Sequence, residues 1–356
     1  MGKHAFRLTL AAMLVALVAI GIYRHFAYFR AKRSETLCYL YDPLIKMQGG
    51  NAGLFCEGLA AVRVHGTWGF IDEKGRYAVG PAFEAAGFFS EGLAPVETGG
   101  KWGYIDGKGD FVIKPQFDRA WDVGEGLAPV ETGGTWGYVD RKGTMVIKPQ
   151  FDDAKDFEEG LARAETGDKW GFIDKKGRYV IGPRFAAAWG FNDGLARVKV
   201  GDKWGYIDRT GTYAINPQFD DAWFFNEGLA RVEIGNKWGY IDRKGRYVIN
   251  PQFDDASWTF NDGLAPAEIA GRWGYIDKKG RFIINPQFDY AGFFSEGLAP
   301  VVIGNRWGYI NKLGRYVINP QFDDAWFFNE GLALVKENNK WGYIDKTGRF
   351  VIKPQF

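Results

Sequence analysis

The sequence predicts an all-β repeat protein: nine three-stranded antiparallel meanders stacked face to face as an open superhelix, after one N-terminal transmembrane helix. Three observations predict this fold class. A Trp-Gly pair recurs every 34 residues, apart from one step of 35. The segments around each pair have the alternating or wholly apolar pattern of strands. The first 33 residues contain an uncharged apolar run. A closed, propeller-like ring of the same units is the alternative.

Composition and charge limit the class of protein and its partners. The chain has 356 residues, of which 46% are apolar and 17% aromatic, which is enough for a packed core. Residues 1–33 contain six Lys or Arg and no acid, which leaves 39 basic against 43 acidic residues in the rest. A mildly acidic body attracts phosphate backbones weakly, so we expect no nucleic-acid partner.

The N-terminal segment has the features of a membrane anchor. Residues 8–23 carry no charge and follow Lys3 and Arg7. Such a run is typical of a signal-peptide core or of a short anchor. The sequence that follows, RHFAYFRAKR, is bulky and basic and offers no small-residue cleavage site. We therefore expect residues 1–33 to be an uncleaved anchor that contacts the membrane through residues 8–23, with a cleaved signal as the alternative.

The side of the membrane is less directly encoded. More basic residues follow the apolar run than precede it, and the positive-inside rule alone would leave the body in the cytoplasm. Export is the common purpose of such segments, so we expect the repeats on the periplasmic or extracellular side. Residues 34–56 form a linker with the only two cysteines, Cys38 and Cys56. They can form a disulfide in an oxidising compartment, and two free thiols are the other interpretation.

The repeated unit contains three expected strands and occupies residues 57–356 in nine copies. In the first strand, Ala94 and Val96 alternate with Pro95, and Arg163 and Arg197 stand at the Pro95 position of other copies, which predicts one buried and one wet face. A two-residue link such as Gly235-Asn236 suits the primed turns of tight hairpins.

The second and third expected strands flank a turn with an acid at its start and a glycine three residues later. The second strand reads KWGYID, and the third, for example 247–249, ends at Pro251, which can donate no ladder hydrogen bond. Both strands are apolar on both faces, so each sheet must be covered on both sides by neighbouring units. The glycine after each tryptophan would admit a neighbouring ring or backbone. The repeat tryptophans expected in this core are Trp68, Trp102, Trp136, Trp170, Trp204, Trp238, Trp273, Trp307 and Trp341.

The unit resembles a known family. WGYID, then KG, then VIxPQFDxAxxFxEGLA is similar to the WG repeat, also called the KWG repeat, found largely in bacterial proteins. The resemblance covers about five-sixths of the chain. It implies a β-rich array with interaction roles and no common activity, active site, metal or cofactor.

Catalytic and metal-binding constellations are absent from the repeats. The three histidines are His4, His25 and His65, too few for a catalytic triad or a metal cluster within the array. The row of turn acids suggests calcium or paired carboxylates, as in glycosidases, but Asn311 takes the same place in one copy. Asparagine serves a turn as well as aspartate does, so we predict a turn role and no enzyme.

The connector after each third strand varies in a way that favours exposure. One of its positions holds Gly87, Trp121, Lys155 or Gly292, and a buried site rarely accepts such different volumes. Its tryptophans are predicted to lie at the surface or rim as a stripe that stacks on sugars or anchors a protein, or else to cover the connector. These candidate binding residues are Trp121, Trp189, Trp223, Trp258 and Trp326.

These features predict a membrane-anchored binding or scaffolding protein of the cell envelope. Its partner would be a protein or a cell-wall polysaccharide, held through repeated weak contacts. A structural spacer without a ligand is the alternative, and a carbohydrate-active enzyme is the remote one.

Overall fold

The structure is a computed structural model that describes residues 51–356. The predicted anchor at residues 1–33 and most of the predicted linker, including Cys38, lie outside the described residues. Within residues 51–356, no helix is long and apolar enough to cross a membrane.

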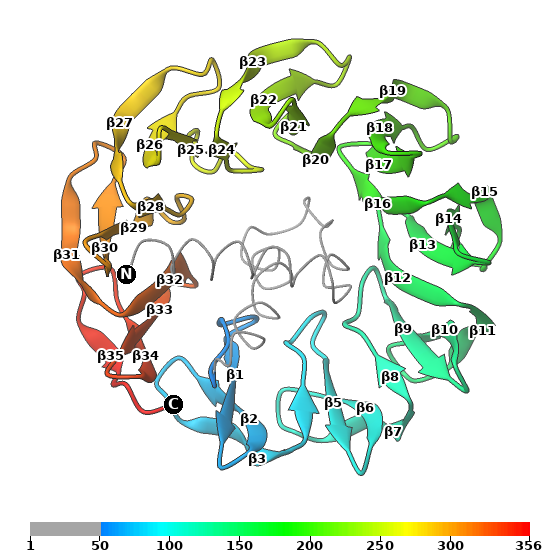
Figure 1. Cartoon of the computed structure of the whole chain (residues 1–356). Coiled ribbons are helices and arrows are strands. Elements are labelled where there is room, and N and C mark those ends of the chain that lie inside the picture. Colours follow the sequence, from blue (N-terminus) through cyan, green and yellow to red (C-terminus); the bar gives the residue numbers. More distant parts are fainter. Residues whose placement is uncertain (1–50) are drawn as a thin grey trace.

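The described chain forms a closed ring of nine antiparallel sheets, the blades of a β-propeller, numbered here 1 to 9 in chain order (Figure 1). The predicted open superhelix is therefore wrong, and the alternative, a closed ring, is the form observed. Eight sheets have four strands, and in sheet 1 an isolated bridge between Ala52 and Val62 stands in for the innermost strand. The prediction of three strands per unit is wrong as well.

The strands fall into four concentric positions. The innermost are β4 (Ala85–Ala86), β8 (Arg119–Ala120), β12 (Asp153–Glu158), β16 (Ala187–Asn192), β20 (Asp221–Asn226), β24 (Asp255–Ala256), β28 (Tyr290–Ala291) and β32 (Asp324–Asn329). The second are β1 (Leu59–Val64), β5 (Ala94–Thr98), β9 (Leu127–Thr132), β13 (Leu161–Thr166), β17 (Leu195–Val200), β21 (Leu229–Ile234), β25 (Ala265–Ile269), β29 (Leu298–Ile303) and β33 (Leu332–Glu337). The third are β2 (Thr67–Asp72), β6 (Lys101–Ile105), β10 (Thr135–Asp140), β14 (Lys169–Ile173), β18 (Lys203–Ile207), β22 (Lys237–Asp242), β26 (Arg272–Ile276), β30 (Arg306–Asn311) and β34 (Lys340–Ile344). The outermost are β3 (Tyr77–Phe83), β7 (Phe111–Phe117), β11 (Met145–Phe151), β15 (Tyr179–Phe185), β19 (Tyr213–Phe219), β23 (Tyr247–Phe253), β27 (Phe282–Phe288), β31 (Tyr316–Phe322) and β35 (Phe350–Ile352).

The innermost strand of each sheet is the segment expected from the sequence to be a connector. It pairs with the first strand of the next unit, as β20 pairs with β21, so one sequence repeat spans parts of two blades. A register shift between Ala222 and Phe225 interrupts this pairing and breaks the period-two pattern. The irregular composition therefore hid a strand.

The ring closes without exchanging a strand between the two ends of the chain. Residues 51–83 form blade 1 and β32 to β35 form blade 9. Across this seam the Tyr343 hydroxyl donates to the Gly53 carbonyl (2.6 Å), and the Asn329 amide donates to the Phe55 carbonyl (2.7 Å). The Tyr309 hydroxyl makes the corresponding bond to Trp326 between blades 8 and 9 (2.7 Å). The seam thus repeats the tyrosine-to-carbonyl bond of an ordinary joint between blades.

The outermost strands continue past their prolines. The predicted end of the third strand at Pro251 is wrong, because β23 runs on to Phe253. This strand has a partner on one side only, so a residue without an N–H costs no ladder bond there.

The turns have the predicted backbone geometry. Gly235 and Asn236 both have positive φ, 58° and 61°, as the primed hairpin turn requires. Gly177 closes the Asp174 turn at φ 77°. Asp72 shows why an acid begins this turn: its carboxylate accepts the N–H groups of Lys74 (3.0 Å) and Arg76 (2.9 Å).

The tryptophan–glycine pairs lie in the third strand, inside each sheet. Six of the nine repeat tryptophans are buried, and Trp102, Trp170 and Trp307 are half-buried. A Cβ on Gly239 would lie 2.5 Å from the Ile249 carbonyl oxygen and 2.6 Å from the Pro251 nitrogen. The glycine therefore admits the backbone of the outermost strand, as the sequence predicted.

Candidate functional site

The five candidate binding tryptophans lie beside or on the innermost strands, and they are less exposed than predicted. Trp223 is buried, with 5% of its surface exposed, and the other four are half-buried. Trp223 stacks on Trp258 with ring centroids 5.1 Å apart, and Trp121 stacks on Trp136 at 6.0 Å. The glycine at this position in blade 2 has a steric reason, because a Cβ on Gly87 would meet the Pro95 ring at 2.6 Å.

Three arginines are buried against these tryptophans: Arg163 and Arg197, which the sequence placed on a wet face, and Arg231. The Arg197 guanidinium carbon lies 4.2 Å from the Trp189 ring centroid and 5.0 Å from that of Trp223. Arg163 and Arg231 occupy the same place in blades 4 and 6. Each arginine donates to an alanine carbonyl on the innermost strand of the next blade, for Arg163 that of Ala188 at 2.8 Å.

These arginines connect blades 4 to 7, and sequence reasoning missed them. The signal was present, since the same position holds Ala, Pro or Leu in the other copies and an exposed position would not favour these apolar residues. Cations over aromatic rings are stabilised by about 0.5–2 kcal/mol each. The tryptophans are thus largely occupied by internal packing.

A charged cluster lies buried on β12 in blade 4. Lys155 forms an ion pair with Asp153 on the same strand, and both side chains are almost fully buried. Burial raises the pKa of Asp156 to about 7, although Lys155 and Arg163 oppose the shift. Burial also raises the pKa of Glu158 well above its ordinary value. Such groups are candidates for function or for pH-dependent stability.

One face of the ring carries a repeated joint between blades. Its acid follows each innermost segment at φ of about 50°. At eight of the nine joints this acid accepts the N–H of the corresponding glycine in the next blade, as Glu159 accepts that of Gly194 at 3.1 Å. The ring of acids is Glu57, Glu91, Glu125, Glu159, Asp193, Glu227, Asp262, Glu296 and Glu330.

A basic residue from the turn between the third and the outermost strands forms an ion pair with the acid at several of these joints. Lys346 pairs with Glu296 at 2.9 Å, and Arg209 pairs with Glu159 at 2.9 Å. At the seam, an acid, Glu73, takes the place of the base. The pKa of Glu330 is raised by burial, and Glu73 adds to the shift. The closing joint therefore lacks the ion pair.

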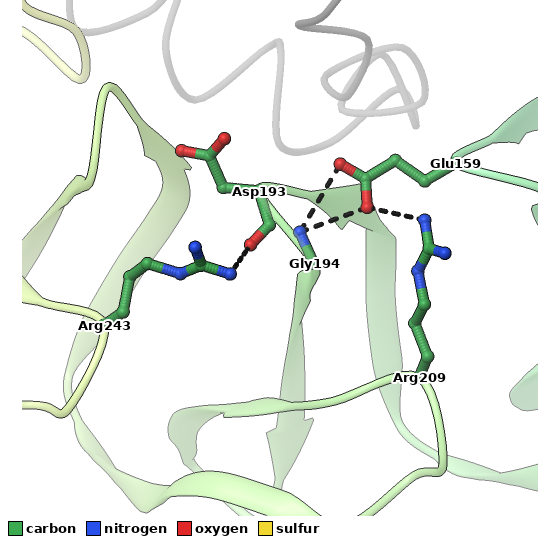
Figure 2. Close-up of a pocket in the computed structure, with 5 residues that line it drawn as sticks. All are labelled: Glu159, Asp193, Gly194, Arg209 and Arg243. Atoms are coloured by element: carbon green, nitrogen blue, oxygen red, sulfur yellow. Dashed lines mark hydrogen bonds and ion pairs between the residues drawn. The ribbon is translucent and has the colours of Figure 1, made fainter.

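A pocket of about 320 Å³ opens between two such joints (Figure 2). It is lined by Glu159, Asp193, Gly194, Arg209 and Arg243. Arg209 pairs with the Glu159 carboxylate, whereas Arg243 donates to the backbone carbonyl of Asp193. Figure 2 shows the Asp193 carboxylate turned away from the Arg243 guanidinium.

The outer rim presents a set of apolar side chains, here called the outer belt. Its members occupy the first two positions of the outermost strands and are 37% to 52% exposed. They are Tyr77, Phe111, Val112, Met145, Val146, Val180, Tyr213, Tyr247, Val248, Ile283, Tyr316, Val317 and Val351. The sequence assigned these residues to covered sheets, because their strands carry no polar alternation.

The turn acids act as the sequence predicted. Asn311 accepts the N–H groups of Leu313 (3.0 Å) and Arg315 (3.1 Å) in the way that Asp72 accepts its own two. The Arg76 side chain, hydrogen-bonded to Asp72, lowers the pKa of that acid. Among residues 51–356, no three His, Cys, Asp or Glu side chains gather as a metal site would need. Cys56 is buried, and its pairing with Cys38, outside that range, stays a prediction.

Comparison with solved structures finds similar folds at low identity. A eukaryotic initiation factor matches with a TM-score of 0.57 and 14% identity, over 82% of this chain and 94% of that chain. The dihydro-heme d1 dehydrogenase NirN matches with a TM-score of 0.45 and 12% identity, over 84% and 74%. Hsv2p of Kluyveromyces lactis matches with a TM-score of 0.39 and 8% identity, over 62% and 90%. Only the first is similar enough to support the fold.

Sequence comparison is more specific. Comparison with curated proteins found no match. The family model described as "WG containing repeat" matches nine consecutive segments: 68–102, 102–136, 136–170, 170–204, 204–238, 238–273, 273–307, 307–341 and 341–356. Each segment begins at a repeat tryptophan whose strand, glycine and turn have been described above. The chain therefore belongs to the family of proteins built from WG repeats.

Proposed function

We propose that this WG-repeat propeller is a membrane-anchored, non-catalytic scaffold of the cell envelope that binds a protein partner through the outer belt. The observation that carries the proposal is the recurrence of exposed apolar side chains at the same place in every blade. Exposed apolar side chains that gather in patches are typical of protein interaction surfaces. Repetition adds avidity, because one partner or several can engage equivalent sites.

A polysaccharide partner is less well supported. Sugar binding would use open aromatic faces, and the tryptophans predicted for it are half-buried or buried and contact one another or cationic side chains. The belt contains valine, isoleucine, tyrosine and phenylalanine, which suit an apolar protein surface. A spacer without a ligand would have no need of these exposed groups.

The belt is tested by adding charge to it. Val112, Val146 and Val248 are changed together to glutamate, and the full-length protein is cross-linked in native membranes before mass spectrometry. A charge buried in an apolar contact loses its hydration, and this desolvation weakens binding. We therefore expect at least a tenfold loss of the cross-linked partner. The control variant changes Gln116, Gln150 and Gln252 to glutamate, which places equal charge on exposed positions of the same strands.

Equal cross-linking of the belt variant and of the control would overturn the proposal. So would a wild-type protein that captures no protein at all, since this outcome favours the spacer. The thermal midpoints of both variants must match that of the wild type, so that lost binding is not lost folding.

The anchor is tested separately. Deletion of residues 1–33 should move the protein from the membrane fraction to the soluble fraction, because the 16 uncharged residues at 8–23 are removed. A deletion of residues 34–46 serves as the control and should leave the protein in the membrane. Retention of the 1–33 deletion in the membrane fraction would contradict this part of the proposal. Protease added to intact cells then reports which side the propeller occupies.

A further inference from the structure

The pocket of Figure 2 lies at the Asp193 joint, where the acid does not pair with the turn base as it does at the Glu125 and Glu159 joints. At most of these joints the acid is glutamate, and at two it is aspartate, Asp193 and Asp262. Aspartate is one methylene shorter, and Asp262 reaches its own base, Lys312, only at 4.0 Å. Asp193 still accepts the N–H of Gly228, at 3.3 Å, but its carboxylate forms no ion pair with Arg243. The base instead donates to the backbone carbonyl of Asp193.

The neighbouring joints show what is missing. Lys175 contacts both the backbone carbonyl of Glu125 (2.9 Å) and its carboxylate (3.1 Å). Arg209 reaches the Glu159 carboxylate at 2.9 Å. Arg243 makes the backbone contact alone, so among residues 51–356 its guanidinium has no carboxylate partner within 4 Å. The Arg243 guanidinium lines the pocket, so its other N–H groups are available to a ligand there.

We propose that this pocket binds a carboxylate group, which takes the place that a glutamate side chain fills at the Glu125 and Glu159 joints. The Arg243 guanidinium would bind the carboxylate through two parallel N–H donors, a geometry that arginine provides and lysine does not. Arg209 on the other wall adds positive potential, and its own charge is balanced by Glu159.

The charges of the pocket favour this ligand over a phosphate. Two guanidinium groups and two carboxylates line it, so its net charge is close to zero. A dianion would be repelled by Glu159 and Asp193, whereas a single negative charge restores the one pairing that is absent. The volume of about 320 Å³ accommodates a side chain that bears one carboxylate. Such a group comes either from a free small acid or from an acidic residue of a peptide.

Asp193→Glu is the decisive variant, because the longer side chain supplies the missing carboxylate from within the protein. Glutamate already occupies the same backbone geometry at Glu159 and Glu227, with φ 50° and 49°, so the substitution adds no strain. We expect it to pair with Arg243, to keep or raise the thermal midpoint, and to prevent ligand binding. Arg243→Gln should also prevent binding, through loss of the guanidinium.

Ligand-observed NMR titration of the full-length protein tests the proposal, with chloride keeping ionic strength constant. The probes are butyrate, for a free acid with one negative charge, and a capped Gly-Glu-Gly peptide, for a peptide-borne carboxylate; inorganic phosphate is the comparison. We expect saturable binding of at least one carboxylate probe by the wild type and by Lys244→Gln, which removes a neighbouring exposed charge. Affinity should fall at least tenfold in Asp193→Glu and in Arg243→Gln.

Which probe binds more tightly identifies the source of the carboxylate. Failure of both probes to bind the wild type would overturn the site. The same conclusion follows if phosphate binds as well as they do, or if Asp193→Glu binds them unchanged. These outcomes do not depend on the outer belt, whose variants leave the pocket intact.

Discussion

Gly239→Ala is expected to unfold or strongly destabilise the propeller, although it adds a single methyl group. The new Cβ would lie 2.5 Å from the Ile249 carbonyl oxygen and 2.6 Å from the Pro251 nitrogen. Both atoms belong to the backbone of β23, which cannot rotate away as a side chain can. Separating β22 from β23 loses ladder bonds and opens the core between two blades. We expect a loss of about 3 kcal/mol or more in the free energy of unfolding.

Gly182→Ala is the matched control. It is also a strand glycine, in β15, but nothing lies within 4 Å of its added Cβ. Its effect should be within about 1 kcal/mol and in the stabilising direction, because alanine reduces the entropy of the unfolded chain. Urea unfolding followed by tryptophan fluorescence gives both values. Equal destabilisation by the two substitutions would show that the close approach at Gly239 is not the cause.

Asp156→Asn is expected to remove a loss of stability on raising the pH. The Asp156 carboxyl is buried on β12, and burial raises its pKa from 3.8 to about 7. The folded protein therefore holds this proton more tightly than the unfolded chain does. Its contribution to stability is complete below pH 4 and is lost as the pH rises towards 7. At pH 8 the loss amounts to up to about 4 kcal/mol.

Asparagine does not titrate, so the variant should be more stable than the wild type at pH 8 and similar to it at pH 4. The charged groups that oppose the shift, Lys155 and Arg163, remain in place. Asp110→Asn, at an exposed turn position, controls for the loss of one negative charge. Free energies of unfolding are measured at half-unit steps from pH 4 to 8. A parallel pH dependence in Asp156→Asn and wild type would contradict the assignment.

Glu158 extends the same argument to the joint between blades 4 and 5. At its position in other blades, Ser90 and Ser295 donate to a carbonyl of the next blade, at 2.8 and 2.6 Å. A carboxylate cannot donate, but a protonated carboxyl can, and burial raises the pKa of Glu158 well above its ordinary value. Arg163, Asp156, Glu125 and Glu159 are the charged groups around it. Its loss of stability with pH therefore has the same sign as that of Asp156.

Much of the fold was predictable because the chain contains nine internal comparisons. Positions that accept few residue types predicted the strands and turns: the glycine after each tryptophan, the paired positive-φ residues such as Gly235-Asn236, and the turn acid that Asn311 replaces. Each of these rules is local, so a single unit is enough to express it. The role of Asn311 as a turn residue is confirmed by its two backbone bonds.

The closed ring and the innermost strand of each sheet were not predictable from the same comparisons. Curvature depends on small angles summed over nine blades, and no single residue encodes it. β24 has only two residues, Asp255–Ala256, and β20 is broken by a register shift, so neither shows a strand period. The burial of Arg197 was not predictable either, because its charge is satisfied by a carbonyl of the next blade and by aromatic rings of both blades.

Closure without a shared strand has a consequence for the gene. In many rings a terminal strand from one end must complete the sheet at the other, so both ends are specialised. Here blades 1 and 9 each carry their own strands, and the seam uses the same Tyr-to-carbonyl bond as the interior joints. Duplication or loss of one 34-residue unit would leave both closing surfaces unchanged. The diameter of the ring is thus free to change by unequal recombination, without new sequence at either end.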